Sequence, residues 1–394
     1  MNGSQWFDST LWDRLSAPTA EGSTLPNAAY VDPDFFAAER DCVFKRHWVF
    51  AEFAHLLAEP GSVRPVEVAG QSLLLTKDSD GVIRAFHNVC IHRGAVLIEE
   101  PRSDCRNIVC PNHSWSYSLK GKLLARPHFF GGDQHDTKPA ECTSNNLVEI
   151  ACHTWHDWVF VNISGDAGPF SSYIAPVLEK IADYNLDSLR LGGTLSFDIE
   201  ANWKLAVENF IEPYHVFSCH PWLHSFVTMA ERDPPTFEDH ILLCGYTFQR
   251  TDPARGEGLP YFPDLPEHKK NRGDWFVLFP NFAFEIFPDQ LVTLVTTPIS
   301  AQSSRETISL YFVGEGADGE QFRAARDTVI KNWHDLNLED IGILERMQRG
   351  RLSDGFNGGV LSPYWDPVQQ HFARLIYKAC LLYTSPSPRD KRQS

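Results

Sequence analysis

The sequence has no uninterrupted apolar run approaching the roughly 18 residues that a membrane-spanning helix needs, so no membrane partner is expected. Its amino terminus, MNGSQWFDSTLWDRL, lacks the basic start and the apolar core of a secretory signal. A formal net charge of −16 argues against a nucleic-acid partner, which needs basic stripes, and is compatible with a basic redox partner or a cationic substrate. Nine cysteines without framework spacing favour a reducing cytoplasm.

Hydrophobic patterning divides the chain into a β-rich part and a mixed part. At 394 residues, about two or three domains are expected. Short apolar runs separated by turns predict a small antiparallel β domain, with strands over 63–68, 72–76 and 82–86. Further along, the pattern predicts helices over 170–190 and 321–349 and strands over 194–199, 241–248 and 291–300. Strands followed by helices indicate an α+β domain, and residues 251–273, rich in Pro, Gly and charge, predict a long loop over the site.

Two cysteines and two histidines stand in two short motifs of mixed composition. Cys90 and His92 are separated by one residue, and Cys110 and His113 are separated by two. Each motif therefore offers one thiolate and one imidazole, which suits a [2Fe–2S] cluster with two cysteines on one iron and two histidines on the other, the Rieske arrangement. Structural zinc uses the same donors but usually pairs like with like, so zinc is the less favoured alternative.

The neighbours of these four residues narrow the type of cluster. Rieske proteins of respiratory cytochrome bc complexes resemble this pattern, but they carry two extra cysteines that form a disulfide where this chain has Ala95 and Asn112. Trp115 stands where those carriers place a serine that bonds to a bridging sulfide. Because fewer hydrogen bonds to sulfur favour the oxidised cluster, we predict a low potential within the Rieske range of about −150 to +300 mV.

A second group of ligand-type residues follows an Asn-Trp-Lys motif at 202–204. This group consists of His215 and His220, which lie 11 and 16 residues after the lysine of the motif. Two imidazoles and one carboxylate on one face of an iron leave three positions open for O2 and substrate, as in non-haem Fe(II) oxygenases. The two histidines are not at ideal spacing for one helical face, but a helix interrupted near Pro213 or locally overwound would bring the rings together. The alternative is that both are ordinary residues of an aromatic-rich segment.

From about residue 48 to about residue 379 the chain resembles the Rieske non-haem iron oxygenases, specifically the large (alpha) subunit of the ring-hydroxylating type. The resemblance is carried by the motifs at 88–95, 110–113, 202–204, 208–220 and 339–350. It implies that the two histidines share a mononuclear Fe(II) with a downstream aspartate, for which Asp340 matches better than its neighbours Asp335 and Glu339. Asn209 is expected to line the iron site or to be a buried structural amide.

Two residues depart from the pattern of most members of that family. Ser114 replaces the glycine that usually follows the last Rieske histidine, which is tolerated unless the backbone there needs a positive φ. Glu212 stands where most ring dioxygenases carry aspartate and where members acting on quaternary ammonium compounds carry glutamate. A carboxylate there is implied to bridge His215 to a Rieske histidine of a neighbouring subunit. The alternative for Glu212 is a helix carboxylate without a coupling role.

The resemblance implies an oxygenase component that receives single electrons from a separate NAD(P)H-dependent reductase of the flavin or ferredoxin type. O2 activated at the iron would hydroxylate or oxidatively demethylate a small organic substrate. Glu212 and the aromatic iron-domain segments, which suit cation–π binding, favour a quaternary ammonium compound. The alternatives are an aromatic-ring hydroxylating dioxygenase and, in another class, a Rieske electron carrier without oxygenase activity. Electron exit through His113 to another subunit implies a ring, with a homotrimer favoured.

The implied organisation is α+β, with a small antiparallel β Rieske domain inserted before a catalytic domain of the helix-grip (START-like) type. We expect a helical segment over 1–45 that packs on the catalytic domain, the Rieske domain over 46–165 and the catalytic domain over 166–380. Residues 381–394 resemble translated sequencing-adapter sequence and are left out of the fold prediction, the alternative being a native basic tail.

Overall fold

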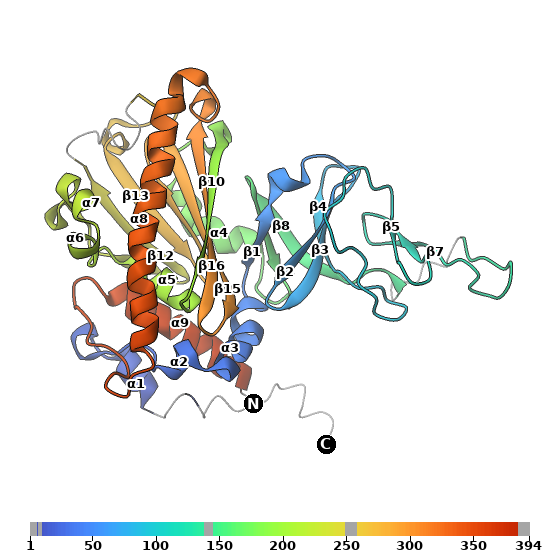
Figure 1. Ribbon diagram of the computed structural model, residues 1–394, viewed down its shortest axis with the longest axis horizontal. Helices are drawn as coiled ribbons and strands as arrows, with labels where there is room; N and C mark the ends of the chain where they lie inside the picture. Colours follow the sequence, from blue (N-terminus) through green and yellow to red (C-terminus); the bar gives the residue numbers. More distant parts are fainter. Residues whose placement is uncertain (1–5, 7–9, 138–144, 249–257, 385–394) are drawn as a thin grey trace. The chain divides into compact units, whose positions relative to one another are not determined.

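In the computed structural model, the described residues are 6, 10–137, 145–248 and 258–384, and they form two compact units (Figure 1). One unit spans Phe44–Tyr173, and the other combines Met1–Val43 with Ile174–Ser394. The sheets are antiparallel and are accompanied by helices, which confirms the predicted α+β class. Within the described ranges, no helix is both long and apolar enough to cross a membrane.

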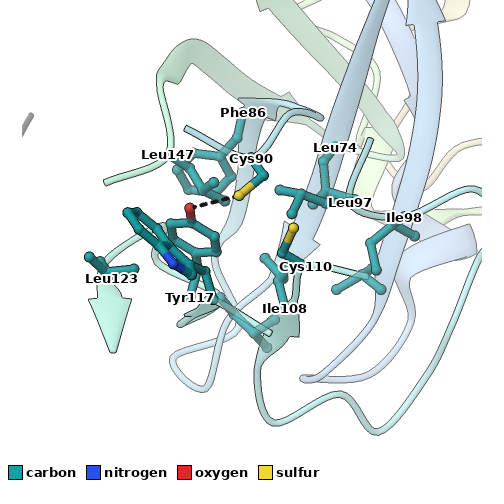
Figure 2. Packing of buried hydrophobic residues seen from close by; sticks show 13 residues of the cluster. Leu74, Phe86, Cys90, Leu97, Ile98, Ile108, Cys110, Tyr117, Leu123 and Leu147 are labelled. Atoms are coloured by element: carbon teal, nitrogen blue, oxygen red, sulfur yellow. Dashed lines mark hydrogen bonds between the residues drawn. The ribbon is translucent and has the colours of Figure 1, made fainter. Parts of the chain in front are cut away.

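The smaller unit is built from two antiparallel sheets. Its six-stranded sheet has the order β1-β9-β8-β4-β3-β2, with strands β1 (Val49–Phe53), β2 (Val63–Val68), β3 (Gln71–Lys77), β4 (Ile83–His87), β8 (Glu149–Trp155) and β9 (Trp158–Asn162). Its three-stranded sheet consists of β5 (Ile108–Val109), β6 (Ser116–Tyr117) and β7 (Leu123–Ala125). The predicted strands over 63–68, 72–76 and 82–86 are β2, β3 and β4. A core of side chains from both sheets holds the unit together (Figure 2).

The larger unit contains a seven-stranded antiparallel sheet in the order β10-β16-β15-β14-β13-β12-β11. The strands are β10 (Leu189–Ile199), β11 (Thr236–Glu238), β12 (Ile241–Thr247), β13 (Arg272–Leu278), β14 (Phe282–Ile286), β15 (Gln290–Ser300) and β16 (Ser303–Val313). Aromatic and β-branched residues dominate the central strands, and β14 is buried at every position. Both faces of the sheet centre are therefore covered.

Helices from three parts of the chain complete this unit. They are α1 (Leu11–Ser16), α2 (Ala28–Val31), α3 (Pro33–Glu39), α5 (Trp203–Ile211), α6 (Val216–Cys219), α7 (Pro221–Phe226), α8 (Arg323–Gly350) and α9 (Pro367–Thr384). The long helix α8 runs along the sheet and contacts β10, α5 and α6 (Figure 1). Helix α5 contacts β12, β13, β15 and β16. Helix α6 in turn contacts α7 and α8.

Buried polar contacts join the N-terminal helices to α5. Lys204 forms an ion pair with Glu39 at 2.7 Å, and both side chains are fully buried. Burial raises the pKa of Glu39 and lowers that of Lys204, and the attraction between the two opposes both shifts. The hydroxyl of Tyr30 donates to Glu208 Oε1 at 2.6 Å. These contacts fix α5, whose last turn leads into the segment with the predicted iron ligands.

The structure differs from the predicted elements in several places. Helix α4 (Phe170–Lys180) ends ten residues before the predicted position 190, because β10 begins at Leu189 and pairs with β16 along its length. Strands β13, β14 and β16 were not predicted. Burial of all of β14 and of the last four residues of β13 removes the alternation that signals a strand there. The predicted loop over 251–273 ends where β13 begins, and its residues 251–257 lie outside the described ranges. Helix α9 continues past residue 380 to Thr384, and residues 385–394 are not described.

Candidate metal centres

The four predicted cluster ligands lie on two loops with the same backbone hydrogen bonds. The N–H of Gly94 donates to the carbonyl of Cys90 at 2.9 Å, and the N–H of Ser114 donates to the carbonyl of Cys110 at 3.1 Å. Each cysteine N–H donates to the carbonyl five residues later, at 2.8 Å in both loops. Two equivalent tight turns therefore present one cysteine and one histidine each.

The sulfur and nitrogen donors of these loops face different environments. Cys90 and Cys110 are 2% exposed and belong to the core of the smaller unit (Figure 2). His92 is half-buried, His113 is exposed, and their ring centroids are 4.7 Å apart. The ring of His92 also stacks on Trp115, with the planes 4° apart. Thiolates inside and imidazoles outside fit a [2Fe–2S] cluster whose histidine-bound iron is the one nearer the surface.

Ser114 has a backbone conformation that L-residues rarely adopt. Its φ is 56°, and the equivalent residue of the other loop, Gly94, has φ 73°. The backbone at position 114 thus needs the positive φ at which serine is strained and glycine is not. We expect Ser114→Gly to stabilise the Rieske unit by about 1 kcal/mol, since a left-handed conformation costs L-residues about that much. Thermal melting followed by cluster absorbance measures the effect, and Ser116→Gly in strand β6 is the control, expected to lower the melting temperature instead.

Tyr117 is a residue of the cluster site that the sequence prediction missed. Its hydroxyl lies 3.3 Å from the sulfur of Cys90, as the dashed line in Figure 2 shows. Burial raises the pKa of the Cys90 thiol, and the bond to Tyr117 opposes that rise. The prediction of a low potential was based on the missing serine at position 115 and did not include this bond. The signal for it was the position of Tyr117, two residues after Trp115 and on the same side of β6.

Tyr117→Phe is expected to lower the reduction potential of the cluster by about 40 mV. A hydrogen bond to sulfur stabilises the reduced, more negative state, and about 1 kcal/mol corresponds to that shift in a one-electron couple. A redox titration followed by the electron paramagnetic resonance signal of the reduced cluster gives the value. Tyr364→Phe changes an exposed tyrosine of the other unit and should leave the potential unchanged. An unchanged potential in Tyr117→Phe would show that the hydroxyl does not bond to the cluster ligand.

The predicted iron ligands converge from two helical segments. Helix α5 ends at Ile211, and the chain continues through a turn into the one-turn helix α6 and then α7, so the helix is interrupted around Pro213 as predicted. His215 precedes α6, His220 lies between α6 and α7, and Asp340 comes from α8. One ligand atom from each lies within 4.8 Å of the others. The Nε2 atoms of His220 and His215 are 2.9 and 3.5 Å from Asp340 Oδ1.

Carboxylates on the far side of each ring set the orientation of both histidines. Nδ1 of His215 bonds to Glu212 Oε1 at 2.8 Å, and Nδ1 of His220 bonds to Glu339 Oε2 at 2.7 Å. Each ring therefore presents Nε2 to the common point, the tautomer that a metal-binding imidazole needs. Burial lowers the pKa of His220, but the contacts with Asp340 and Glu339 outweigh it and leave a net rise.

Asn209 was expected to line the iron site or to be a buried structural amide, and Glu339 and Asp335 were the alternatives to Asp340 as the third ligand. Asn209 donates to Asp340 Oδ1 at 2.8 Å, so it lies at the site and positions the aspartate. Glu339 does not reach the common point but holds His220. Asp335 is exposed and bonds to Lys331 and His334. The 2-His-1-carboxylate set suited to iron is thus His215, His220 and Asp340.

A pocket opens next to these three residues. Of the aromatic residues in the iron-domain segments, for which cation–π binding was predicted, Phe210, Trp222 and Trp333 line this pocket. Others on the central strands, such as Phe282 and Phe284, are buried core. Sequence reasoning missed the pocket residues contributed by the sheet and its edge, namely Arg232, Tyr246, Trp275, Glu285 and Gln290.

Two centres of these kinds in one chain define a class of enzyme: an oxygenase that accepts electrons at a [2Fe–2S] cluster and uses O2 at a mononuclear iron. Residues 47–130 match the family described as "Rieske [2Fe-2S] domain", and residues 186–381 match the family described as "Ring hydroxylating alpha subunit (catalytic domain)". The chain belongs to the alpha subunits of the Rieske oxygenases. Its cofactors are therefore a Rieske cluster and a mononuclear iron, and its electrons come from a partner reductase.

Several named proteins are similar to this chain over most of its length. It is 24% identical to the carnitine monooxygenase oxygenase subunit of Acinetobacter pittii over 339 residues, covering 85% of this chain and 87% of the relative. It is also 24% identical to the glycine betaine monooxygenase oxygenase subunit of Pseudomonas aeruginosa, covering 87% and 86%. Choline monooxygenase of Spinacia oleracea is 24% identical, with 87% and 75% covered.

Solved structures share the fold. The quaternary ammonium Rieske monooxygenase CntA in complex with L-carnitine superimposes with a TM-score of 0.74 at 22% identity, covering 93% of this chain and 98% of CntA. Naphthalene 1,2-dioxygenase from Rhodococcus gives 0.74 at 20% identity, covering 96% and 98%. Enzymes with different substrates thus share this architecture, so the fold alone does not identify the substrate.

Proposed function

We propose that this oxygenase hydroxylates a carbon bonded to the nitrogen of a quaternary ammonium compound. The observation that carries the proposal is the glutamate at position 212, held against His215 at 2.8 Å. Glutamate at this point is typical of members acting on quaternary ammonium compounds, whereas aspartate is typical of ring dioxygenases. The relatives named for carnitine, glycine betaine and choline support the same substrate class.

The pocket offers suitable chemistry for such a cation. Phe210, Trp222 and Trp333 line the pocket together with the iron ligands, and aromatic faces attract an ammonium without donating a hydrogen bond. Asp340 adds a negative charge at the same end. A trimethylammonium group seated there would place its carbons near the point on which the ligands converge.

The proposal gives each ligand-type residue a role. Cys90, His92, Cys110 and His113 hold the cluster, and His215, His220 and Asp340 hold the iron. When bound, the iron would supply O2 activation: one oxygen atom of O2 would enter a C–H bond of the substrate as a hydroxyl, and the other, with two electrons from the reductase and two protons, would leave as water. A hydroxyl on a carbon bonded to nitrogen then breaks the C–N bond, and the products are an amine and an aldehyde.

Glu212 is the residue that we propose as the link between the two centres. Its Oε1 accepts from His215 Nδ1, and its Oε2 accepts from the backbone N–H groups of Tyr214 and His215. An ionised carboxylate has about four acceptor sites, so one remains for an imidazole N–H from outside. The proposed donor is His113 of another subunit in a homotrimer. None of the eight described cysteines forms a disulfide, in keeping with the reducing cytoplasm proposed for the assembly.

O2 uptake with a surrogate reductase over a panel of carnitine, betaines, choline and aromatic acids tests the substrate class. A quaternary ammonium compound is expected to stimulate uptake, with an aldehyde formed in equal amount. Stimulation by an aromatic acid alone, with a hydroxylated ring as the product, would replace the proposal by the ring-hydroxylating alternative. Absence of a mononuclear iron from the purified protein would leave only an electron carrier.

A further inference from the structure

The pocket beside the iron ligands contains two buried N–H groups that the proposed chemistry does not use. Arg232 and Trp275 line the pocket and are 4% and 6% exposed. Within the part of the chain that the structure describes, neither Arg232 Nε nor Trp275 Nε1 has a hydrogen-bond partner. Buried donors without acceptors are costly, so such groups in a binding pocket point to a ligand that supplies the acceptor.

The two donors belong to one stack of three side chains, in which Tyr246 contacts both of the others. Arg232 forms a backbone bridge with Tyr246, and its guanidinium lies over the Tyr246 ring, 5.1 Å from the centroid. The ring of Tyr246 meets that of Trp275 edge-on at 5.2 Å. One nitrogen of the guanidinium donates to the carbonyl of Val227 at 3.4 Å, which helps to fix the group. The stack is therefore a built feature of the sheet edge and not a pair of mobile surface residues.

The charged residues of this pocket restrict the kinds of ligand that it can bind. Burial lowers the pKa of Arg232, and the nearby Cys244 and Glu285 oppose that change. The guanidinium carries a positive charge because arginine is always protonated in proteins. Glu285 is 8% exposed and faces Trp275 across the strand pair β13–β14. Arg232 offers a positive charge to an anionic group, and the carboxylates of Glu212, Glu285 and Asp340, which also line the pocket, favour a ligand that carries a positive charge as well. A dianion such as a phosphate would leave a buried charge uncompensated.

We propose that Arg232 and Trp275 bind the carboxylate of a substrate whose other end is a quaternary ammonium group. The carboxylate accepts from Arg232 Nε–H and Trp275 Nε1–H, and the ammonium end lies toward the aromatic residues and the iron ligands. The inference depends on the proposed function, because it assigns the second end of the same substrate. The proposed subsite favours zwitterions, such as glycine betaine and carnitine, over choline, which has a hydroxyl in place of the carboxylate.

The test is the ratio of kcat/KM for glycine betaine to that for choline, measured as O2 uptake by the iron-loaded enzyme with a surrogate reductase. Arg232→Gln is expected to lower this ratio by at least about 10-fold, as loss of a hydrogen bond to a charged group does. Trp275→Phe keeps the ring, removes only the N–H and is expected to lower the ratio about 3-fold or more. Arg305→Gln changes an arginine paired with Asp198 on the exposed end of β16, and should leave the ratio unchanged.

The outcomes distinguish the subsite from the proposed function. If the wild-type enzyme oxidises quaternary ammonium compounds but Arg232→Gln and Trp275→Phe weaken choline as much as glycine betaine, the subsite is wrong and the function stands. If the wild-type enzyme oxidises none of them, both proposals fail together. Iron content and cluster absorbance show whether Arg232→Gln is folded. If it is not, Trp275→Phe decides, and an unchanged ratio in that variant overturns the carboxylate subsite.

Discussion

Replacing Asp340 by alanine is expected to remove the mononuclear iron, about one iron per chain, and to leave the two irons of the cluster in place. The variant loses the oxygen ligand that lies 2.9 Å from Nε2 of His220. It also frees Asn209, whose amide donates to the same oxygen. Product formation should fall below detection, while the reduced protein keeps the resonance signal of the cluster. Iron analysis and that signal, measured on one sample, separate loss of one metal from unfolding.

Two variants serve as matched controls for the Asp340 prediction. Asp335→Ala removes a carboxylate from the same helix, five residues earlier, where it bonds to Lys331 and His334. His224→Ala removes the imidazole four residues after His220. The Nδ1 atom of His224 has no hydrogen-bond partner among the residues described. Both should keep all three irons. If His224→Ala loses the iron and His220→Ala does not, the set of iron ligands assigned to the larger unit is wrong.

The cysteine and histidine candidates of both centres could be proposed from the sequence because each pair is local, whereas Asp340 was matched only through the family resemblance. Cys90 and His92 share one tight turn and Cys110 and His113 another, so short spacings define each pair. The break of the helix near Pro213 followed from the missing N–H of proline and brought both iron histidines to one side. In each case the sequence distance is shorter than two helical turns.

The remaining parts of the site depend on contacts between distant segments. Glu339 was known only as a neighbour of Asp340, and its bond to His220 required the placement of α8 against α6. Arg232 and Trp275 meet through Tyr246 because β12 pairs with β13, and β13 was not predicted. Fully buried strands have no polar–apolar alternation, so neither their existence nor the residues that they bring to the pocket could be read from the pattern.

Glu212→Gln is expected to slow electron transfer from the cluster to the iron by at least about 10- to 100-fold while both metals stay bound. The amide keeps the size of the side chain, but it has no negative charge, and its NH2 group cannot accept a hydrogen bond. One of the three contacts made by the carboxylate is therefore lost, together with the acceptor site proposed for the second subunit. Glu212→Asp, one methylene shorter, should give an intermediate rate.

Stopped-flow oxidation of the pre-reduced cluster by O2 in the presence of substrate measures this step directly. Glu339→Gln is the matched control, because Glu339 holds the other iron histidine through the same kind of bond, at 2.7 Å rather than 2.8 Å. If carboxylates matter only for orienting the imidazoles, the two variants should lose the same amount of rate once iron is restored. A selective loss in Glu212→Gln instead assigns the coupling to position 212, since both histidines keep their ligand role and only Glu212 is the proposed acceptor for the second subunit.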